Sequence, residues 1–370
     1  MNVVVFTPAL VAGDAVSNDV LGMVAALERA GHRAYPAARW ILNEIKAATL
    51  EEIPNLLTEP DDVLIYHHSI GLDDAVRMYE SLPCRKIVKY HNVTPAHFFE
   101  GINKEVVRAC REGLEQLSRL IPTCAAFWAD SEFNGHDMQA RHPEQDFDVL
   151  PPFNQVEELI AAEPDLTTVA QYDDWLTNIL VVGRIVPNKN NMLAVEAFAE
   201  YRARHDPLSR LIFVGDVGQN FYCDKVIQRI RDLRMSRNVC MTGKISLRQL
   251  KTLYQTAQML LTTSSHEGFC LPILEGMGLR VPLVALPNAA IPGTAGESAW
   301  YASESAETIA DVMNHVRQNP RGREEKLNLG RERYLDHFRN EAIERRFLDL
   351  FATASESCLA IHPPEAKKTP

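Results

Sequence analysis

Short apolar runs alternate with amphipathic segments along the first half of the chain. The runs are rich in β-branched residues and fall at 3–6, 63–66, 86–90, 125–129 and 149–150. Between several of them lie stretches such as 16–30 and 104–120, whose apolar residues recur every three or four positions. The first of these stretches is followed by Gly31, a natural stop for a helix. This alternation predicts parallel βαβ units.

The same alternation begins again after a loose, acidic, proline-containing segment at 152–177. Further strands are predicted at 178–182, 211–214, 239–242, 259–262 and 282–285. We therefore expect an α/β protein with two Rossmann-like domains, 1–165 and 175–340, whose parallel sheets face each other across a cleft. A last helix, about 341–360, has no strand after it, and we expect it to pack back on the first domain.

Length and charge narrow the possible functions. A chain of 370 residues exceeds the usual domain of about 100–200 residues, which agrees with two domains. Its net charge of −11 argues against general binding to nucleic acid, because that needs a basic surface to displace phosphate counterions. An anionic ligand must therefore meet a local positive site.

Cysteine usage and the N-terminus indicate a cytoplasmic protein. The seven cysteines are scattered and form no C-x-x-C pair, so they signal neither a disulfide framework nor a zinc site. No basic leader and no apolar run of about 18 residues occurs. Peripheral attachment at the inner face of a membrane stays open.

Two cations follow the first strand of the second domain. The strand runs into Gly183 and Arg184, and Lys189 comes five residues later. Glycine frees the backbone at the strand end, while a guanidinium fork and an ammonium group can hold a diphosphate without a metal. The alternative is that both side chains are solvated or pair with nearby acids.

A second candidate segment follows the strand at 259–262. Pro272 suits the first position of a helix, so the amides of Phe269, Cys270 and Leu271 can face an anion at the helix start. Gly268 lets the backbone come close to a ligand. Glu267 and Glu275 can project toward the same crevice, where carboxylates would hold hydroxyl groups. Alternatively, Glu275 only complements the helix dipole and Glu267 faces solvent.

These two segments together resemble family 4 of the retaining glycosyltransferases, which have the GT-B fold. The resemblance rests on Gly183-Arg184 with Lys189, then on Glu267 and Glu275 eight positions apart with Gly268-Phe269 between them. It is strongest over 178–285 and extends weakly to the first half. The chain departs from the family pattern at Gly13, where many relatives have two glycines, and at Cys270, where a glycine is common.

The resemblance implies a role for each matching residue. Arg184 and Lys189 would bind the diphosphate of a nucleotide sugar, Glu275 the ribose, and Glu267 the donor sugar. Gly183, Gly268 and the amides of Phe269, Cys270 and Leu271 would complete the donor site, and Lys244 and Ile245 would flank the base. Gly13 and His91 would line the donor-sugar and acceptor side. Catalysis would fall to Arg184, Lys189, Glu267 and His91, with no metal and no cofactor.

The expected activity is transfer of a hexose from a GDP- or UDP-linked donor to a glycan or lipid-linked acceptor. Bacterial surface polysaccharide and lipopolysaccharide assembly is the expected setting, by analogy with relatives. The alternatives are a GT-B sugar-nucleotide epimerase and a non-catalytic nucleotide-sugar-binding subunit of a transferase complex.

Other motifs carry less weight. Asp146 and Asp148 match the D-x-D of metal-dependent transferases but lead into a predicted strand. His67, His68, His91 and His97 lack the helical H-x-x-x-H spacing or a thiolate partner, so packed or polar histidines are the default. No P-loop and no G-x-G-x-x-G motif is present.

Overall fold

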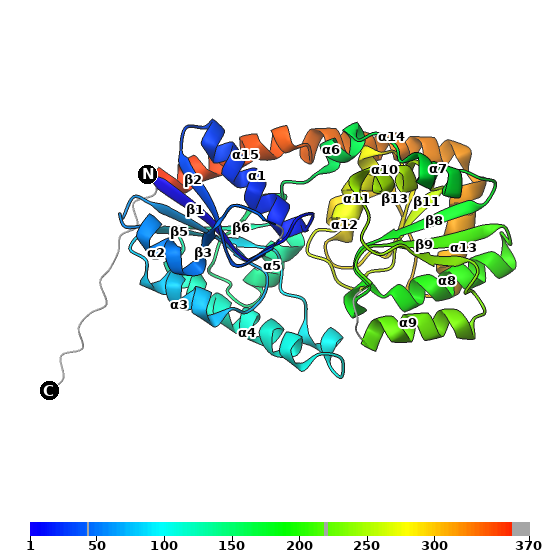
Figure 1. The fold of residues 1–370 in the computed structure, drawn as a ribbon, viewed down its shortest axis with the longest axis horizontal. Helices are drawn as coiled ribbons and strands as arrows, with labels where there is room; N and C mark the ends of the chain where they lie inside the picture. The colour runs from blue at the N-terminus through cyan, green and yellow to red at the C-terminus, as the bar shows by residue number, and fades with distance from the viewer. Residues whose placement is uncertain (43, 218–220, 357–370) are drawn as a thin grey trace.

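The structure, a computed structural model, describes residues 1–42, 44–217 and 221–356. Two parallel sheets lie side by side, each flanked by helices (Figure 1). The predicted pair of Rossmann-like domains facing each other is confirmed. The expected extension of the last helix to residue 360 lies partly outside the described residues.

The first sheet has seven strands in the order β3-β2-β1-β4-β5-β6-β7. The strands are β1 (Asn2–Leu10), β2 (Arg33–Ile41), β3 (Ala48–Thr49), β4 (Val63–His68), β5 (Arg85–Tyr90), β6 (Ala126–Ala129) and β7 (Asp148–Val149). The associated helices are α1 (Ala15–Arg29), α2 (Ile53–Leu56), α3 (Asp73–Ser81), α4 (Lys104–Leu120) and α5 (Glu132–Gln139). Successive residues of β1 enter cores on opposite faces, Val3 and Val5 on one and Val4 and Phe6 on the other, because side chains alternate along a strand.

The second sheet has six strands in the order β10-β9-β8-β11-β12-β13. The strands are β8 (Thr177–Val182), β9 (Ser209–Val214), β10 (Val239–Met241), β11 (Met259–Thr262), β12 (Leu283–Ala285) and β13 (Ala299–Tyr301). The helices that follow or precede them are α6 (Val156–Ala161), α7 (Leu166–Tyr172), α8 (Asn191–Arg204), α9 (Phe221–Asp232), α10 (Leu247–Thr256), α11 (Leu271–Gly278), α12 (Ile291–Ala295), α13 (Ala306–Gln318) and α14 (Pro320–His337). Two apolar cores again cover the two faces of the sheet.

The last helix, α15 (Asn340–Glu356), returns from the second sheet to the first (Figure 1). Its Ile343, Phe347 and Phe351 join the core beneath α1. The ring of Phe347 packs edge-on against Trp128, with the ring centroids 5.9 Å apart. Because these side chains are buried, α15 ties the end of the chain to the first domain.

Three strands are absent from the sequence prediction: β2, β13 and the two-residue β3, which is too short for a period to be read. The strand β2 carries Arg33, Arg39 and Pro36, so it lacks the continuous apolar pattern that marks buried strands. The strand β13 has only three residues, too few for a period to be read. No helix in the described part of the chain combines the length and apolarity that a membrane crossing requires.

Candidate functional site

The candidate site lies where the order of strands reverses. In the second sheet the chain builds outward from β8 in one direction and then from β11 in the other. Loops that leave the carboxyl ends of such a strand pair diverge, and the crevice between them is the usual ligand position in open α/β sheets. Arg184 and Lys189 follow β8, whereas Glu267 and Cys270 follow β11.

Two glycines at the strand ends add no side chains to the base of this crevice. Gly183 has φ of +141°, in the region that favours glycine, and the side chain of Lys189 runs past it, 3.7 Å from where a Cβ would stand. Gly215, at the end of β9, has φ of +137°, and a Cβ there would lie 2.3 Å from the Gly183 carbonyl oxygen. Packing against Gly183 therefore requires a glycine at position 215, which the sequence analysis had not singled out.

Lys189 is anchored by an acid of the facing loop. Its Nζ lies 2.5 Å from Oε1 of Glu267, and the same oxygen accepts a hydrogen bond from Ser264 Oγ at 2.7 Å. Burial opposes the charged form of Lys189, but the adjacent Glu267 carboxylate outweighs it and raises the pKa of Lys189. Lys189 therefore stays a cation, aimed into the crevice.

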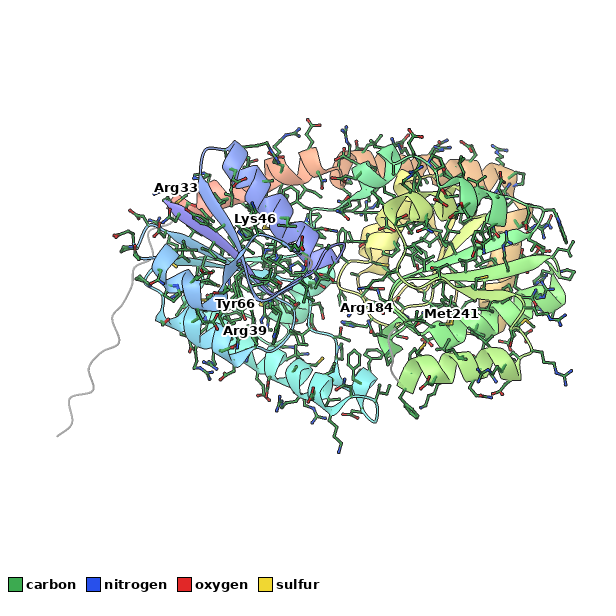
Figure 2. All side chains as sticks on the ribbon, in the orientation of Figure 1. Arg33, Arg39, Lys46, Tyr66, Arg184 and Met241 are labelled. Carbon is green, nitrogen blue, oxygen red and sulfur yellow. The ribbon has the colours of Figure 1, made fainter. Side chains whose placement is uncertain are left out.

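Arg184 is exposed, in contrast to Lys189. Within the described residues, no carboxylate or carbonyl group pairs with its guanidinium. Figure 2 shows Arg184 on the side of the second domain that faces the first. Its donors are therefore available to an incoming anion.

The start of α11 supplies the third element of the crevice. The sequence predicted Pro272 as the first residue of this helix. In the structure the helix begins one residue earlier, at Leu271. Cys270 caps it with φ of +77° and ψ of +68°, a left-handed conformation that costs roughly 1–2 kcal/mol for a non-glycine residue. The described residues supply no hydrogen-bond acceptor to the amides of Gly268, Phe269 or Cys270, so these amides can bind a ligand oxygen.

A small cavity joins these parts. Its walls include Gly183, Arg184, Lys189, Glu267 and Cys270. The structure thus brings together the two predicted cations, one predicted carboxylate and the helix start. Burial raises the pKa of the Cys270 thiol well above its usual range, so Cys270 contributes shape and not a thiolate.

Glu275 is not part of that cavity. It lies on α11, and its Oε2 accepts a hydrogen bond from the hydroxyl of Tyr254 on α10 at 2.5 Å. Burial raises the pKa of Glu275, while the Tyr254 hydroxyl opposes that rise. The sequence had not singled out Tyr254, which fixes the direction of this carboxylate.

The loop after β10 carries the two residues expected beside a base. Lys244 is exposed, with its Nζ 3.5 Å from Asp216 Oδ2. Ile245 packs partly against the core around α10 and α11. Gly243 has φ of +70°, and its carbonyl oxygen accepts from the amide of Gly215 at 3.1 Å, so this loop adjoins the base of the crevice.

The first sheet has its own reversal point, between β1 and β4. Gly13 follows β1 and is exposed, with φ of +76° and no atom within 4 Å of a Cβ placed there. His91 follows β5 and is almost fully buried. Both of its ring nitrogens have partners in the protein: Nδ1 lies 2.7 Å from Asp130 Oδ2, and Nε2 lies 2.7 Å from His67 Nδ1.

The loop after β11 docks against the first domain. Ser131 Oγ donates to the Gly268 carbonyl oxygen at 2.9 Å, and His266 Nε2 lies 3.0 Å from Asn92 Oδ1. The ring of His266 also lies edge-on to Phe133, with ring centroids 5.8 Å apart. These contacts hold the two domains together beside the candidate site.

We expect Gly268→Ala to separate the two domains. A Cβ at this position would lie 2.4 Å from the carbonyl oxygen of His91, and backbone cannot yield cheaply, so the contact should cost about 1–3 kcal/mol. Small-angle scattering should report a larger radius of gyration. The matched control is Gly293→Ala, because no atom lies within 4 Å of a Cβ there. An unchanged radius in Gly268→Ala would contradict this docking contact.

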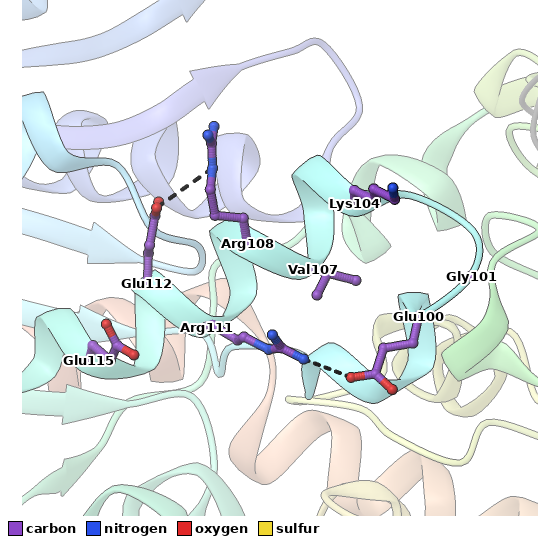
Figure 3. Close-up of a pocket in the computed structure, with 8 residues that line it drawn as sticks. All are labelled: Glu100, Gly101, Lys104, Val107, Arg108, Arg111, Glu112 and Glu115. Atoms are coloured by element: carbon purple, nitrogen blue, oxygen red, sulfur yellow. Dashed lines mark hydrogen bonds and ion pairs between the residues drawn. The ribbon is translucent and has the colours of Figure 1, made fainter.

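A larger hollow of about 530 Å³ lies away from these residues. Its walls come only from the segment 100–115 at the N-terminal part of α4, and they are mostly charged (Figure 3). Arg111 pairs with Glu100 at 2.8 Å, and Arg108 lies 3.6 Å from Glu112. Since these charges largely pair with each other and no predicted site residue lines the hollow, we do not assign the reaction to it.

The remaining sequence candidates lie elsewhere. Asp146 and Asp148 are exposed at the edge strand β7. Among the described residues, the side chains close enough together to hold a metal are Asp19, His67 and His91, a group that excludes both of these acids. The sequence treated the histidines as separate packed residues, and only the fold brings His67 and His91 together.

The second domain of this chain matches a known protein family. Residues 175–333 match the family model of Glycosyl transferases group 1. The serotype-specific mannosyltransferase WbdA of Escherichia coli is 27% identical over 158 residues, which make up 41% of this chain and 19% of that enzyme. The match therefore spans about a fifth of the relative's length.

Solved structures resemble nearly the whole chain. Anabaena Alr3699/HepE in complex with UDP-glucose has a TM-score of 0.70 at 14% identity, covering 95% of this chain and 100% of that one. WaaG, a glycosyltransferase involved in lipopolysaccharide biosynthesis, has a TM-score of 0.69 at 13% identity, covering 94% and 99%. At such identities these likenesses concern the fold alone.

Proposed function

We propose that this chain, whose residues 175–333 match the family model of Glycosyl transferases group 1 and whose fold is GT-B, transfers a hexose from a nucleotide diphosphate sugar, with retention of configuration and without a metal. The acceptor is a hydroxyl of a glycan or of a lipid-linked saccharide. The proposed setting is the assembly of bacterial surface polysaccharide at the cytoplasmic side of the membrane.

One observation carries the proposal. Arg184, Lys189 and the start of α11 surround one cavity at the reversal point of the second sheet. Two cations, one of them paired with Glu267, and unpaired amides at a helix start leave a net positive site on a protein whose net charge is −11. These donors suit a diphosphate, which the cavity of about 10 Å³ can admit only after the loops that line it move apart.

The same geometry can assist the chemical step. When the bond between the sugar and the diphosphate breaks, negative charge grows on the departing phosphate. Donors fixed in advance around that phosphate stabilise the transition state more than the ground state. Lys189 is held in advance by Glu267, which can then turn to the hydroxyls of the donor sugar.

The names of relatives support the finer parts of the proposal. The relative in Escherichia coli is a mannosyltransferase, which favours a mannose-type hexose and a surface glycan as product. The Anabaena neighbour is bound to UDP-glucose, which supports a UDP-linked donor as one candidate beside the GDP-linked donor expected from the sequence.

A thermal-shift panel of nucleotides and nucleotide sugars, with EDTA present, tests the donor class. We expect one nucleoside diphosphate and its sugar to raise the melting temperature, and the same donor to give a product with an oligosaccharide acceptor. A donor converted to a different sugar nucleotide would indicate an epimerase. A shift without product for any donor and acceptor would indicate a non-catalytic subunit. Activity that manganese restores after its loss in EDTA would contradict metal independence.

We expect Glu275→Ala to weaken nucleotide binding by about tenfold or more, because a hydrogen bond to a charged carboxylate contributes roughly 1.5–3 kcal/mol. Calorimetry with the preferred nucleoside diphosphate measures the effect. Tyr254→Phe is the companion variant, since it releases the Glu275 carboxylate without removing it. Equal affinities for Glu275→Ala and the unaltered protein would rule out the ribose role.

A further inference from the structure

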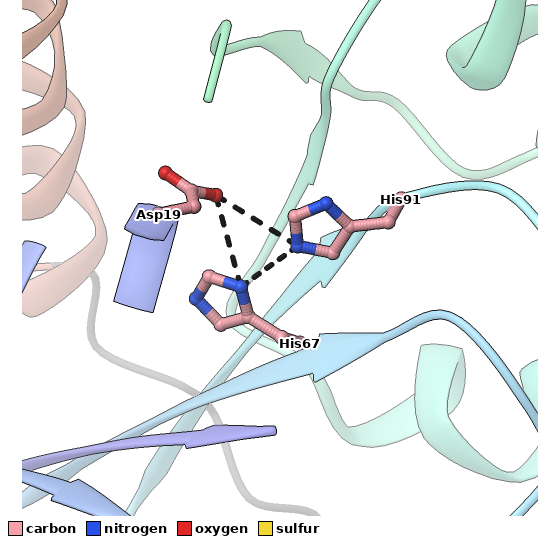
Figure 4. Close-up of side chains that lie close together, drawn as sticks. All are labelled: Asp19, His67 and His91. Atoms are coloured by element: carbon pink, nitrogen blue, oxygen red, sulfur yellow. Dashed lines mark hydrogen bonds and ion pairs between the residues drawn. The ribbon is translucent and has the colours of Figure 1, made fainter. Parts of the chain in front are cut away.

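Five polar side chains form a buried chain of contacts in the first domain. Lys89 on β5 donates to Asp130 and to the carbonyl oxygen of Leu150. Asp130 in turn contacts His91, and His91 contacts His67 on β4. Asp19 on α1 completes the group (Figure 4), and its side chain and that of His67 are fully buried.

The hydrogen bonds determine where the protons of His91 and His67 lie. Asp130 accepts from an ammonium group, so its carboxylate is ionised, and neighbouring His91 and Lys89 lower the pKa of Asp130 despite its burial. Nδ1 of His91 must then donate to Asp130. Nε2 of a neutral His91 is left as an acceptor, so the proton in the His67–His91 contact belongs to Nδ1 of His67.

Like His67, whose Nε2 has no partner among the described residues, Asp19 is an unsatisfied member of the group. Its Oδ1 accepts from the amide of Phe153 at 2.9 Å, but its Oδ2 has no hydrogen-bond partner. That oxygen lies 3.7 Å from both His67 Nδ1 and His91 Nε2. Burial raises the pKa of Asp19 to about 6, although Lys89 and His91 oppose the rise. A buried carboxylate oxygen without a partner, equidistant from two ring nitrogens, is costly unless a proton accompanies it.

We propose that Asp19 and His91 share one exchangeable proton, and that Asp19 and His67 are positioning residues which set the charge of His91, whereas Asp130 keeps a proton on its Nδ1. In one state Asp19 is a neutral carboxyl and His67 donates to His91. In the other, the Asp19 O–H bond is broken and a N–H bond forms at Nε2 of His91. The rings must turn for this step, because Asp19 Oδ2 lies 3.7 Å from both nitrogens and two N–H groups cannot face each other across 2.7 Å. Asp19 Oδ2 then accepts from Nε2 of His91, and the total charge of the cluster is unchanged.

The charges around the cluster permit both states. Lys89 and Asp130 neutralise each other, which leaves one proton to balance Asp19. His68, at the end of the same strand as His67, has its Nε2 on the carbonyl oxygen of Gly113, and burial lowers its pKa to about 4, so it stays neutral. Burial also lowers the pKa of His67, which places the positive charge of the second state on His91.

The position of the cluster suggests what a positive charge on His91 would do. It lies at the reversal point of the first sheet, and the carbonyl oxygen of His91 is in close contact with Gly268, next to the start of α11. A positive charge on His91 would act through space on an anion bound at the start of α11, so donor binding would favour the charged state. This last step rests on the proposed function, whereas the proton sharing does not.

The same three groups could also ligate a cation, but their spacing favours a shared proton. The two ring nitrogens are 2.7 Å apart, which is a hydrogen-bond distance. Ligands of one tetrahedral zinc, with bonds of about 2.0–2.1 Å, lie roughly 3.3 Å apart. We therefore treat bound metal as the competing result of the test below.

Nitrogen-detected NMR of the imidazole rings in the unliganded protein, followed from pH 5 to pH 8, tests the proposal. His67→Gln and His91→Gln assign the signals. At pH 8 we expect His91 to carry its proton on Nδ1, and at lower pH to become an imidazolium. Asp19→Asn should move that transition down by about 1 to 3 pH units, because an opposite charge within hydrogen-bonding range has been removed.

Asp14→Asn is the matched control. It removes a carboxylate from the same helix, where Asp14 is the N-cap and asparagine caps equally well, so the His91 transition should not move. If Asp19→Asn does not fold, the His91 transition in His67→Gln decides. It should move, because the N–H group that occupies Nε2 of His91 is lost, and an unchanged transition there would overturn the proposal. An identical transition in Asp19→Asn, a proton on Nε2 at pH 8, or one zinc per chain by elemental analysis would overturn the proposal. None of these results depends on the donor or the acceptor.

Discussion

Lys189→Ala is expected to lower kcat by about 10²–10³-fold at saturating donor. The loss of one preorganised donor to a developing oxyanion typically raises the barrier by about 3–4 kcal/mol. Lys189 is held in the crevice by Glu267, so little reorganisation is needed when charge develops on the phosphate. Steady-state kinetics with the preferred donor measures the change.

The same variant also leaves Glu267 buried without its partner. Breaking a buried pair is destabilising, so the melting temperature should fall as well. Lys189→Ala in a Glu267→Gln background separates the two effects, since the double variant should recover stability but not kcat. Lys225→Ala, at an exposed lysine of the same domain, is the control for loss of charge. A kcat within threefold of the unaltered enzyme would contradict the role of Lys189.

Arg184→Ala is expected to lower kcat/KM by about 10²-fold while the stability stays unchanged. Its guanidinium has no partner among the described residues and is exposed, so its removal breaks no internal contact. The expected loss again corresponds to one fixed donor to the leaving phosphate. Kinetics and thermal unfolding of the same preparation provide both measurements.

Arg184→Lys is informative beside it, because an ammonium keeps the charge but not the planar fork that binds two phosphate oxygens. We expect only partial activity from this variant. Arg231→Ala, at an exposed arginine on α9, removes the same charge away from the crevice and should leave kcat/KM as it was. If Arg184→Ala and Arg231→Ala behave alike, the guanidinium of Arg184 does not touch the donor.

Much of the fold could be predicted because buried parallel strands are nearly continuous apolar runs. The helix at 104–120 and the strand at 259–262 were predicted with the bounds that the structure has. The strand β2 was missed because Arg33, Pro36 and Arg39 interrupt its apolar pattern. Such a strand is recognisable only from its pairing with β1.

The grouping of Arg184, Lys189 and Glu267 was predictable for a different reason. Arg184, Lys189 and Glu267 each follow a predicted strand, and parallel strands bring their carboxyl ends to the same edge of a sheet. The residues that orient the carboxylates of this site could not be predicted. Ser264 and Tyr254 carry no motif. The hydrogen bond from Ser264 to Glu267 depends on the conformation of one loop, and that from Tyr254 to Glu275 depends on how α10 and α11 are placed.

The cluster around His91 could not be predicted either, because its members are far apart in the sequence. Asp19, His67, His91 and Asp130 come from four different elements, separated by up to 111 residues from the first to the last. Each one alone is an ordinary buried polar residue. Their contact depends on the order β1-β4-β5-β6 in the sheet, which no local pattern encodes.

The central claim is that a diphosphate is held, without a metal, by the side chains of Arg184 and Lys189 and by the amides at the start of α11. A crystal structure of the protein with the preferred nucleoside diphosphate, grown in EDTA, tests it most directly. We predict that the terminal phosphate lies within hydrogen-bonding distance of both cations and of at least one amide at 268–270. A phosphate bound elsewhere, or one that reaches neither Arg184 nor Lys189, would contradict the account.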